Sequence, residues 1–88
     1  MSHRVQWTPP ARRDMARLPA TIAGAVLAYL DGRLAAYPRR LGKPLDGDLA
    51  GLFTARNGDY RILLRVDDDP AVIWIIHVDH RAHVYRPR

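Results

Sequence analysis

The sequence predicts an α+β domain in which an N-terminal strand and a helical hairpin precede a three-stranded antiparallel meander. The four strands are expected to form one sheet with the helices on one face. Three observations support this prediction: an alternating apolar segment opens the chain, two helical segments separated by a proline follow, and three apolar segments joined by short turns close it. At 88 residues there is room for one modest core, so residues 1–88 are expected to be a single domain.

The first half of the chain is expected to hold one strand and two helices. Apolar and polar residues alternate over His3–Thr8, which predicts the strand. Thr8 is then a suitable N-cap for a short helix ending at Arg17, and the two prolines that follow it are tolerated in the first turn of a helix. Leu18-Pro19 ends that helix, since proline removes an amide donor and restricts the residue before it. An apolar stripe predicts a longer helix over Ala20–Ala36.

The second half is expected to be a loop and a meander. Arg39–Ala50 is rich in Gly, Pro and Asp and is predicted to be a loop. Two turn sequences follow at Asn57-Gly58 and Asp67–Pro70. The strands that these turns separate are predicted to be Gly51–Arg56, Tyr60–Val66 and Val72–Val78.

Alternation along the meander separates an apolar face from a cationic face. On the middle strand, the face expected under the helices comprises Tyr60, Ile62, Leu64 and Val66. The opposite, partly open face comprises Arg61, Leu63 and Arg65. On the last strand, the most continuous apolar set is Val72, Trp74, Ile76 and Val78. That choice leaves Ile73, Ile75 and His77 on the open side, with His77 near Arg61 or Arg65, unless the register shifts by one residue.

The charge of the chain is unusual in its make-up. The formal net charge is +5 and the pI about 10.4; 13 of the 14 basic residues are Arg, and all 9 acids are Asp. Arginine pairs bidentately with phosphate, so this bias suits an RNA partner. A GC-rich coding sequence would produce the same bias, so the positions of the arginines have to decide between the two explanations.

Composition also excludes several classes of protein. The chain has no cysteine, which rules out disulfides and thiolate zinc sites. Its apolar runs are far shorter than the roughly 20 residues of a membrane span, and its N-terminus has no apolar signal core. We therefore expect a cytoplasmic protein without a membrane partner.

Arg61 and Arg65, four residues apart on the same open sheet face, would make an anion-binding platform. The competing interpretation is that they pair with Asp59 or with the aspartates of Asp67–Asp69. The histidines of the C-terminal third lie on strand and loop rather than on a fixed helix face, so neither a metal site nor a cofactor is expected.

Two motifs resemble the RelE/ParE superfamily of bacterial toxins. One is Tyr60-Arg61 followed by Ile-Leu, and the other is His80-Arg81 followed by Val84-Tyr85. The resemblance covers nearly the full chain, and the second motif favours the RelE branch. It implies the toxin of a type II toxin–antitoxin system: a ribosome-dependent mRNA endonuclease that cuts A-site codons by 2′-hydroxyl attack and inhibits translation. The implied partners are an acidic or amphipathic RelB-like antitoxin, the ribosome and mRNA. The alternatives are a ParE-like gyrase inhibitor and a non-catalytic family member that binds RNA or its antitoxin.

The resemblance also assigns roles to residues. Arg61 would contact the scissile phosphate, Arg81 would be the second functional arginine, and either Tyr85 or His83 would be the general base. Further residues expected to bind RNA are Lys43, Arg56, Arg65, His80 and Arg86. The chain departs from the best-known member of the family at Leu52 and Thr54, where that member has lysines; this departure puts the strength of cleavage in question.

Overall fold

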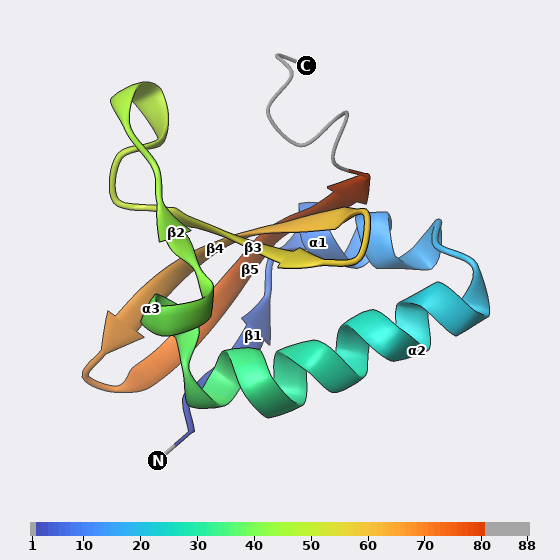
Figure 1. Cartoon of the computed structure of the whole chain (residues 1–88), viewed down its shortest axis with the longest axis horizontal. Coiled ribbons are helices and arrows are strands. Elements are labelled where there is room, and N and C mark those ends of the chain that lie inside the picture. The colour runs from blue at the N-terminus through green and yellow to red at the C-terminus, as the bar shows by residue number, and fades with distance from the viewer. Residues whose placement is uncertain (1, 81–88) are drawn as a thin grey trace.

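A computed structural model describes residues 2–80 and shows one mixed five-stranded sheet packed against helices (Figure 1). The strand order is β1-β5-β4-β3-β2; β1 is parallel to β5, and the other pairs are antiparallel. The strands are β1 Arg4–Trp7, β2 Lys43–Pro44, β3 Phe53–Asn57, β4 Tyr60–Asp68 and β5 Ala71–His80. The helices are α1 Pro9–Ala16, α2 Ala20–Tyr29 and α3 Pro38–Leu41, with a π-helical turn at Leu30–Leu34 and a 3₁₀ turn at Gly47–Leu49.

The predicted α+β class is confirmed, but the predicted number of strands was too low. The missing strand is β2, which lies with α3 inside the segment predicted to be a loop. Two residues ending in a proline are too short to show the alternation that identifies a strand. β2 pairs with β3 through Lys43–Thr54 and Pro44–Phe53 and forms one edge of the sheet.

The helical hairpin begins and breaks where the sequence predicted. Thr8 caps α1, its Oγ1 accepting the amide of Ala11 at 3.4 Å. Pro19 separates α1 from α2. Beyond α2 the chain remains helical, but Leu30–Leu34 forms a π-helical turn, and Leu30 and Leu34 are fully buried there.

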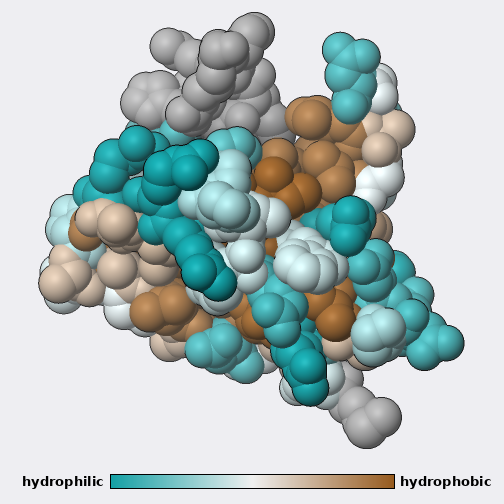
Figure 2. Space-filling view, turned by 180° about the vertical axis from the view of Figure 1, so that it is seen from behind, coloured by the Kyte–Doolittle hydropathy of each residue, from teal (hydrophilic) through white to brown (hydrophobic). Residues whose placement is uncertain are grey.

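The core lies between these helices and one face of β4 and β5. Its largest buried side chains are Val26, Leu30, Leu34, Ile62, Leu64, Ile73, Ile75 and Val78. The assignment of Ile62 and Leu64 to the helix-facing side of β4 is therefore confirmed. The surface seen from behind is a patchwork of hydrophilic side chains and smaller apolar areas (Figure 2).

The predicted face of β5 was wrong over most of the strand. Leu63 pairs with His77 and Leu64 with Ile75, so Ile76 is an extra residue in a β-bulge. The two faces of β5 exchange at the bulge. Ile73 and Ile75 point into the core before the bulge, and Val78 points into the core after it. Strict alternation could not reveal this exchange, because both faces of this strand are apolar before the bulge.

Two polar side chains hold the bulged part of β5, where β1 no longer covers the edge. Thr8 Oγ1 donates to the carbonyl of Ile75 at 2.8 Å and lies 3.2 Å from the carbonyl of Ile76. Asp14, only 4% exposed, accepts the amide of Val78 at 3.0 Å. These side chains replace the strand partner that the edge lacks, since they hydrogen-bond to the Ile75 carbonyl and the Val78 amide.

An exposed ion pair between Arg39 and Asp68 joins α3 to the end of β4. Arg39 donates twice to the Asp68 carboxylate, at 2.7 and 2.9 Å. This bidentate hydrogen bonding, with a smaller contribution from His3 at 3.5 Å, holds the pKa of Asp68 below its usual range.

The lowered pKa makes a testable prediction for Asp68→Asn. A carboxyl whose folded pKa lies below its unfolded pKa stabilises the fold above the unfolded pKa of about 3.9, and this stabilisation is lost as the pH falls through the folded pKa. Asp68→Asn should therefore lower the Tm slightly at pH 7 and by a smaller amount at pH 2. Thermal unfolding at both pH values, with exposed Asp69→Asn as the control, checks this; an equal Tm difference at both would contradict it.

Candidate functional site

The face of the sheet that turns away from the helices brings the predicted cations into register. Cross-strand partners point to the same face of a sheet. Arg56 of β3 is the partner of Arg61 of β4, and Lys43 of β2 is the partner of Thr54 of β3. We call the surface formed by Lys43, Arg56 and Arg61 the cationic face. Its three cations come from three adjacent strands, and the edge strand that supplies Lys43 was not expected from the sequence.

A cavity of about 280 Å³ opens at the cationic face. Its lining comprises Leu41, Lys43, Thr54, Ala55, Arg56 and Arg61. Within the described part of the chain, Arg61 Nη1 and Thr54 Oγ1 are buried and have no hydrogen-bond partner. Leaving a buried donor unsatisfied costs roughly 1–3 kcal/mol, and more when the group is charged. A ligand with anionic oxygens would recover that cost, so the cavity is suited to phosphate.

Like charges directly opposite each other on a sheet repel. Arg56 of β3 and Arg61 of β4 are nevertheless such a pair. On the other side of Arg61, its partner on β5 is Asp79. Asp79 also accepts the amide of His80 at 2.7 Å. In these described rows of the sheet, three cations thus face one carboxylate, which leaves a positive potential for an anionic ligand.

Arg65 lies outside the cavity and already has partners. Its Nη2 is 3.4 Å from a carboxylate oxygen of Asp67, and its guanidinium carbon lies 5.8 Å from the ring centroid of Trp74. The structure thus supports the competing interpretation, pairing with a nearby aspartate, for Arg65. A contribution of Arg65 to RNA binding stays a prediction.

The two described histidines of β5 occupy different faces. His80 is the partner of Tyr60, and their ring centroids lie 5.8 Å apart in an edge-to-face arrangement, so the register does not bring His80 together with Arg61. His77 is the partner of Leu63, which shares its face of β4 with Arg61 and Arg65, so the open side predicted for His77 is confirmed. Its ring turns to Asp14, with 2.9 Å between Nδ1 and Oδ2.

Asp14 is the residue of this region that sequence reasoning missed. It is a single acid in an arginine-rich helix, and nothing in the local pattern distinguishes it from a solvent-exposed residue. Only the fold brings α1 to the edge of β5 and buries the carboxylate.

Four of the predicted site residues, Arg81, His83, Tyr85 and Arg86, lie outside the described residues. Their roles stay predictions. The best-known member of the family has lysines at the positions of Leu52 and Thr54. Thr54 lines the cavity, whereas Leu52 is half-buried just before β3 and does not line it.

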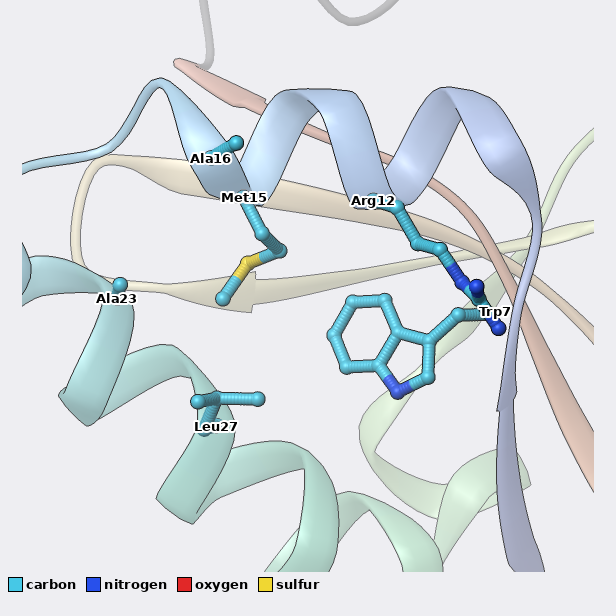
Figure 3. Close-up of a pocket in the computed structure, with 6 residues that line it drawn as sticks. All are labelled: Trp7, Arg12, Met15, Ala16, Ala23 and Leu27. Atoms are coloured by element: carbon cyan, nitrogen blue, oxygen red, sulfur yellow. The ribbon is translucent and has the colours of Figure 1, made fainter.

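A second cavity is an apolar groove of about 490 Å³ between α1, α2 and β1 (Figure 3). Its lining comprises Trp7, Arg12, Met15, Ala16, Ala23 and Leu27. Leu27 is 42% exposed, and α2 carries no charged residue along its length. Helices of soluble proteins usually present a polar stripe to water, so this uncharged surface is suited to a partner.

Residues 2–80 hold neither a cluster of metal-ligating side chains nor a membrane-spanning helix. No three side chains of the kinds that ligate metals lie close enough together to hold an ion. No helix there is both long and apolar enough to cross a membrane.

Comparison with known proteins gives consistent matches over nearly the whole chain. A family model described as the ParE toxin of the type II toxin–antitoxin system parDE matches residues 5–85. Toxin RelG of Mycobacterium tuberculosis (strain ATCC 25618 / H37Rv) is 48% identical over 86 residues, which make up 98% of this chain and 99% of RelG. Toxin RelE of the same organism is 45% identical over 84 residues, which make up 96% of this chain and 87% of RelE.

A solved structure agrees with these sequence matches. The crystal structure of the toxin–antitoxin complex RelBE2 from Mycobacterium tuberculosis contains a chain that superimposes with a TM-score of 0.88 at 46% identity. The match covers 92% of this chain and 100% of the other.

The cavity at the cationic face predicts binding of inorganic phosphate that depends on Arg61. Arg61→Gln should weaken it by roughly tenfold or more, since a hydrogen bond to a charged group contributes about 1.5–3 kcal/mol. Amide chemical-shift titration with phosphate measures the change. Arg33→Gln removes the same charge from an exposed helical position and should leave phosphate affinity nearly unchanged. Equal losses in both variants would show that only net charge matters.

Proposed function

The chain belongs to the RelE/ParE superfamily of type II toxin–antitoxin toxins, and from this premise we propose that it is a ribosome-dependent endoribonuclease. It would cut mRNA in the ribosomal A site and so stop translation. The observation that carries the proposal is the cavity at the cationic face, where Arg61 Nη1 is buried without a hydrogen-bond partner among the described residues.

The reaction needs an arginine at the scissile phosphate. The 2′-oxygen attacks the adjacent phosphorus, the bond from phosphorus to the 5′-oxygen breaks, and a cyclic phosphate and a 5′-hydroxyl remain. Negative charge builds up on the phosphoryl oxygens in the transition state, and a preorganised cation at this point lowers the barrier. Arg61 fits this role because it stays charged and points into the cavity. Arg81 would add a second guanidinium, as the family resemblance implies.

Lys43 and Arg56 would hold the phosphates on either side of the cut. Both are exposed and line the cavity, so they can reach a backbone that runs across the face. Contacts of this kind position the RNA and make its affinity fall with salt. Thr54 offers a hydroxyl where the best-known member has a lysine, so charge at this position is lower in this chain.

Two proton transfers accompany the displacement: one leaves the 2′-hydroxyl and one reaches the 5′-oxygen. Tyr85 and His83 are the residues that the resemblance offers for these steps. A free tyrosine has a pKa near 10, so it would need adjacent cations to act as a base, whereas histidine titrates near neutral pH.

A RelB-like antitoxin is the proposed protein partner, since the similar Mycobacterium tuberculosis structure is a toxin–antitoxin complex. We assign one amphipathic antitoxin helix to the apolar groove. Its apolar residues would contact Trp7 and Leu27, and an acidic residue beside them would pair with Arg12, which lines the groove. The net charge of +5 on the chain complements an acidic partner.

A ParE-like gyrase inhibitor is the second candidate, favoured by the description of the matching family model. The Tyr60-Arg61 strand does not discriminate, since both branches share it. The His80-Arg81 and Val84-Tyr85 motif favours the RelE branch. DNA double-strand breaks with intact mRNA after induction would establish gyrase as the target instead.

Primer extension on a defined transcript tests the endoribonuclease. We expect cuts in the A-site codon when programmed ribosomes are present and none in naked RNA. Arg61→Ala and Arg81→Ala should each lower the cleavage rate by about 100-fold or more, the usual effect of removing one group that stabilises developing charge. The control is Arg33→Ala, which removes the same charge from an exposed position.

The outcomes of that experiment separate the candidates. Ribosome binding without cuts would indicate a non-catalytic family member, and the absence of both would direct attention to gyrase. Full activity of the Arg61 variant would refute its assignment to the scissile phosphate.

Leu27→Arg tests the antitoxin surface separately from catalysis. It places a charge in the apolar groove beside Arg12 and should cost about 2 kcal/mol of binding energy, or roughly a 30-fold weaker complex. Cleavage by the free toxin should not change. Tyr37→Arg, at a residue 53% exposed and outside the groove, is the control in an isothermal titration with the antitoxin. Equal weakening by both variants would place the antitoxin elsewhere.

A further inference from the structure

The most unusual polar group in the described part of the chain is the carboxylate of Asp14, which the mechanism above does not use. It is 4% exposed, although aspartate is seldom buried unless it is paired. Oδ1 lies 2.8 Å from Arg17 Nη2, while Oδ2 accepts the Val78 amide at 3.0 Å and lies 2.9 Å from His77 Nδ1. The carboxylate thereby fixes the imidazole relative to the backbone of β5.

This contact determines which ring nitrogen of His77 carries the proton. An ionised carboxylate only accepts hydrogen bonds, so Nδ1 must be the donor toward Oδ2. In the neutral imidazole the other nitrogen, Nε2, is then an acceptor. Nε2 makes no hydrogen bond to the described residues, and the side chain is 32% exposed. A base oriented by a carboxylate, with its second nitrogen accessible, is the arrangement that proton abstraction needs.

The sheet register places this imidazole on the same face as Arg61. One row across the strands runs Lys43, Thr54, Leu63 and His77. The adjacent row runs Arg56, Arg61 and Asp79. Neighbouring rows on one face are about 7 Å apart, two residues at about 3.3 Å each. His77 does not line the cavity, but it lies one strand and one row away from Arg61, a diagonal separation of roughly 7–8 Å, so a nucleotide bound across this face would contact both.

From this geometry we propose that His77, oriented by Asp14, is the base that removes the 2′-proton. The proposal rests on the endoribonuclease function proposed above. The proton of the 2′-hydroxyl moves to Nε2 as the bond from the 2′-oxygen to phosphorus forms. The bond to the 5′-oxygen breaks, and that oxygen takes a proton from solvent water. Asp14 acts through His77 and is a positioning residue.

The proposal also accounts for activity without the lysines of the best-known member. Neither Leu52 nor Thr54 can accept a proton near neutral pH, whereas histidine can. The charged groups around His77 are Asp14 and Arg17 from α1, Asp79 on β5, and Arg61 and Arg65 from the neighbouring rows of β4.

Single-turnover cleavage on programmed ribosomes, followed from pH 5.5 to 8.5, tests this role. His77→Gln should lower the rate by about 100-fold or more and flatten the profile, since general-base catalysis contributes roughly 10²–10⁴. Asp14→Asn should lower the rate by a smaller factor. His3→Gln, at the N-terminal end of the chain, is the matched control and should keep the wild-type rate and profile.

A second measurement does not depend on activity. Nitrogen-15 NMR of the imidazole in the free wild-type protein should show the proton on Nδ1 in the neutral ring, and Asp14→Asn should reduce that preference. Wild-type rate and profile in His77→Gln, or a proton on Nε2 in the wild type, would overturn the role of His77 alone. No cuts by the wild type would overturn the endoribonuclease itself, and His77 as its base would fall with it.

Discussion

The fold depends on how the last strand is held where its parallel neighbour ends. β1 covers only the first part of the outer edge of β5, from Val72 to Ile75. Beyond this point, two side chains hydrogen-bond to the backbone of β5: that of Thr8, which caps α1, and the buried carboxylate of Asp14 on the same helix. A buried carboxylate is costly unless it is satisfied, so the helix, the bulge and the strand end must form together.

The bulge held in this way decides what each face of the sheet carries. Without it, alternation would keep Ile73, Ile75 and His77 on one face; with it, the two isoleucines pack in the core and the histidine shares the face of Arg61. Bulges commonly re-aim side chains, and this one separates the part of β5 that packs Ile73 and Ile75 in the core from the part that carries His77 on the opposite face. The helix that stabilises the end of β5 therefore also sets the face of the sheet on which His77 lies.

Much of the fold could be predicted because its signals are local. Alternation along β4 correctly assigned Ile62 and Leu64 to the core and Arg61 to the opposite face. Thr8 as a cap and Pro19 as a helix breaker follow from backbone chemistry alone. The bulge could not be predicted, because an apolar strand buries side chains on both faces and gives no sign of an inserted residue. The hydrogen bonds that join Asp14 to His77 and Val78 connect residues more than sixty positions apart.

The two edges of the sheet have a consequence for recognition. β1 has four residues, and β2 has two, one of which is a proline that cannot donate a hydrogen bond. Such short edge strands present few unpaired backbone groups, so they discourage edge-to-edge pairing of sheets from separate molecules. They also offer little template for a peptide that would bind by extending the sheet. A partner that binds at these two edge strands would therefore rely on side-chain contacts, which it can change by substitution without having to match a strand register.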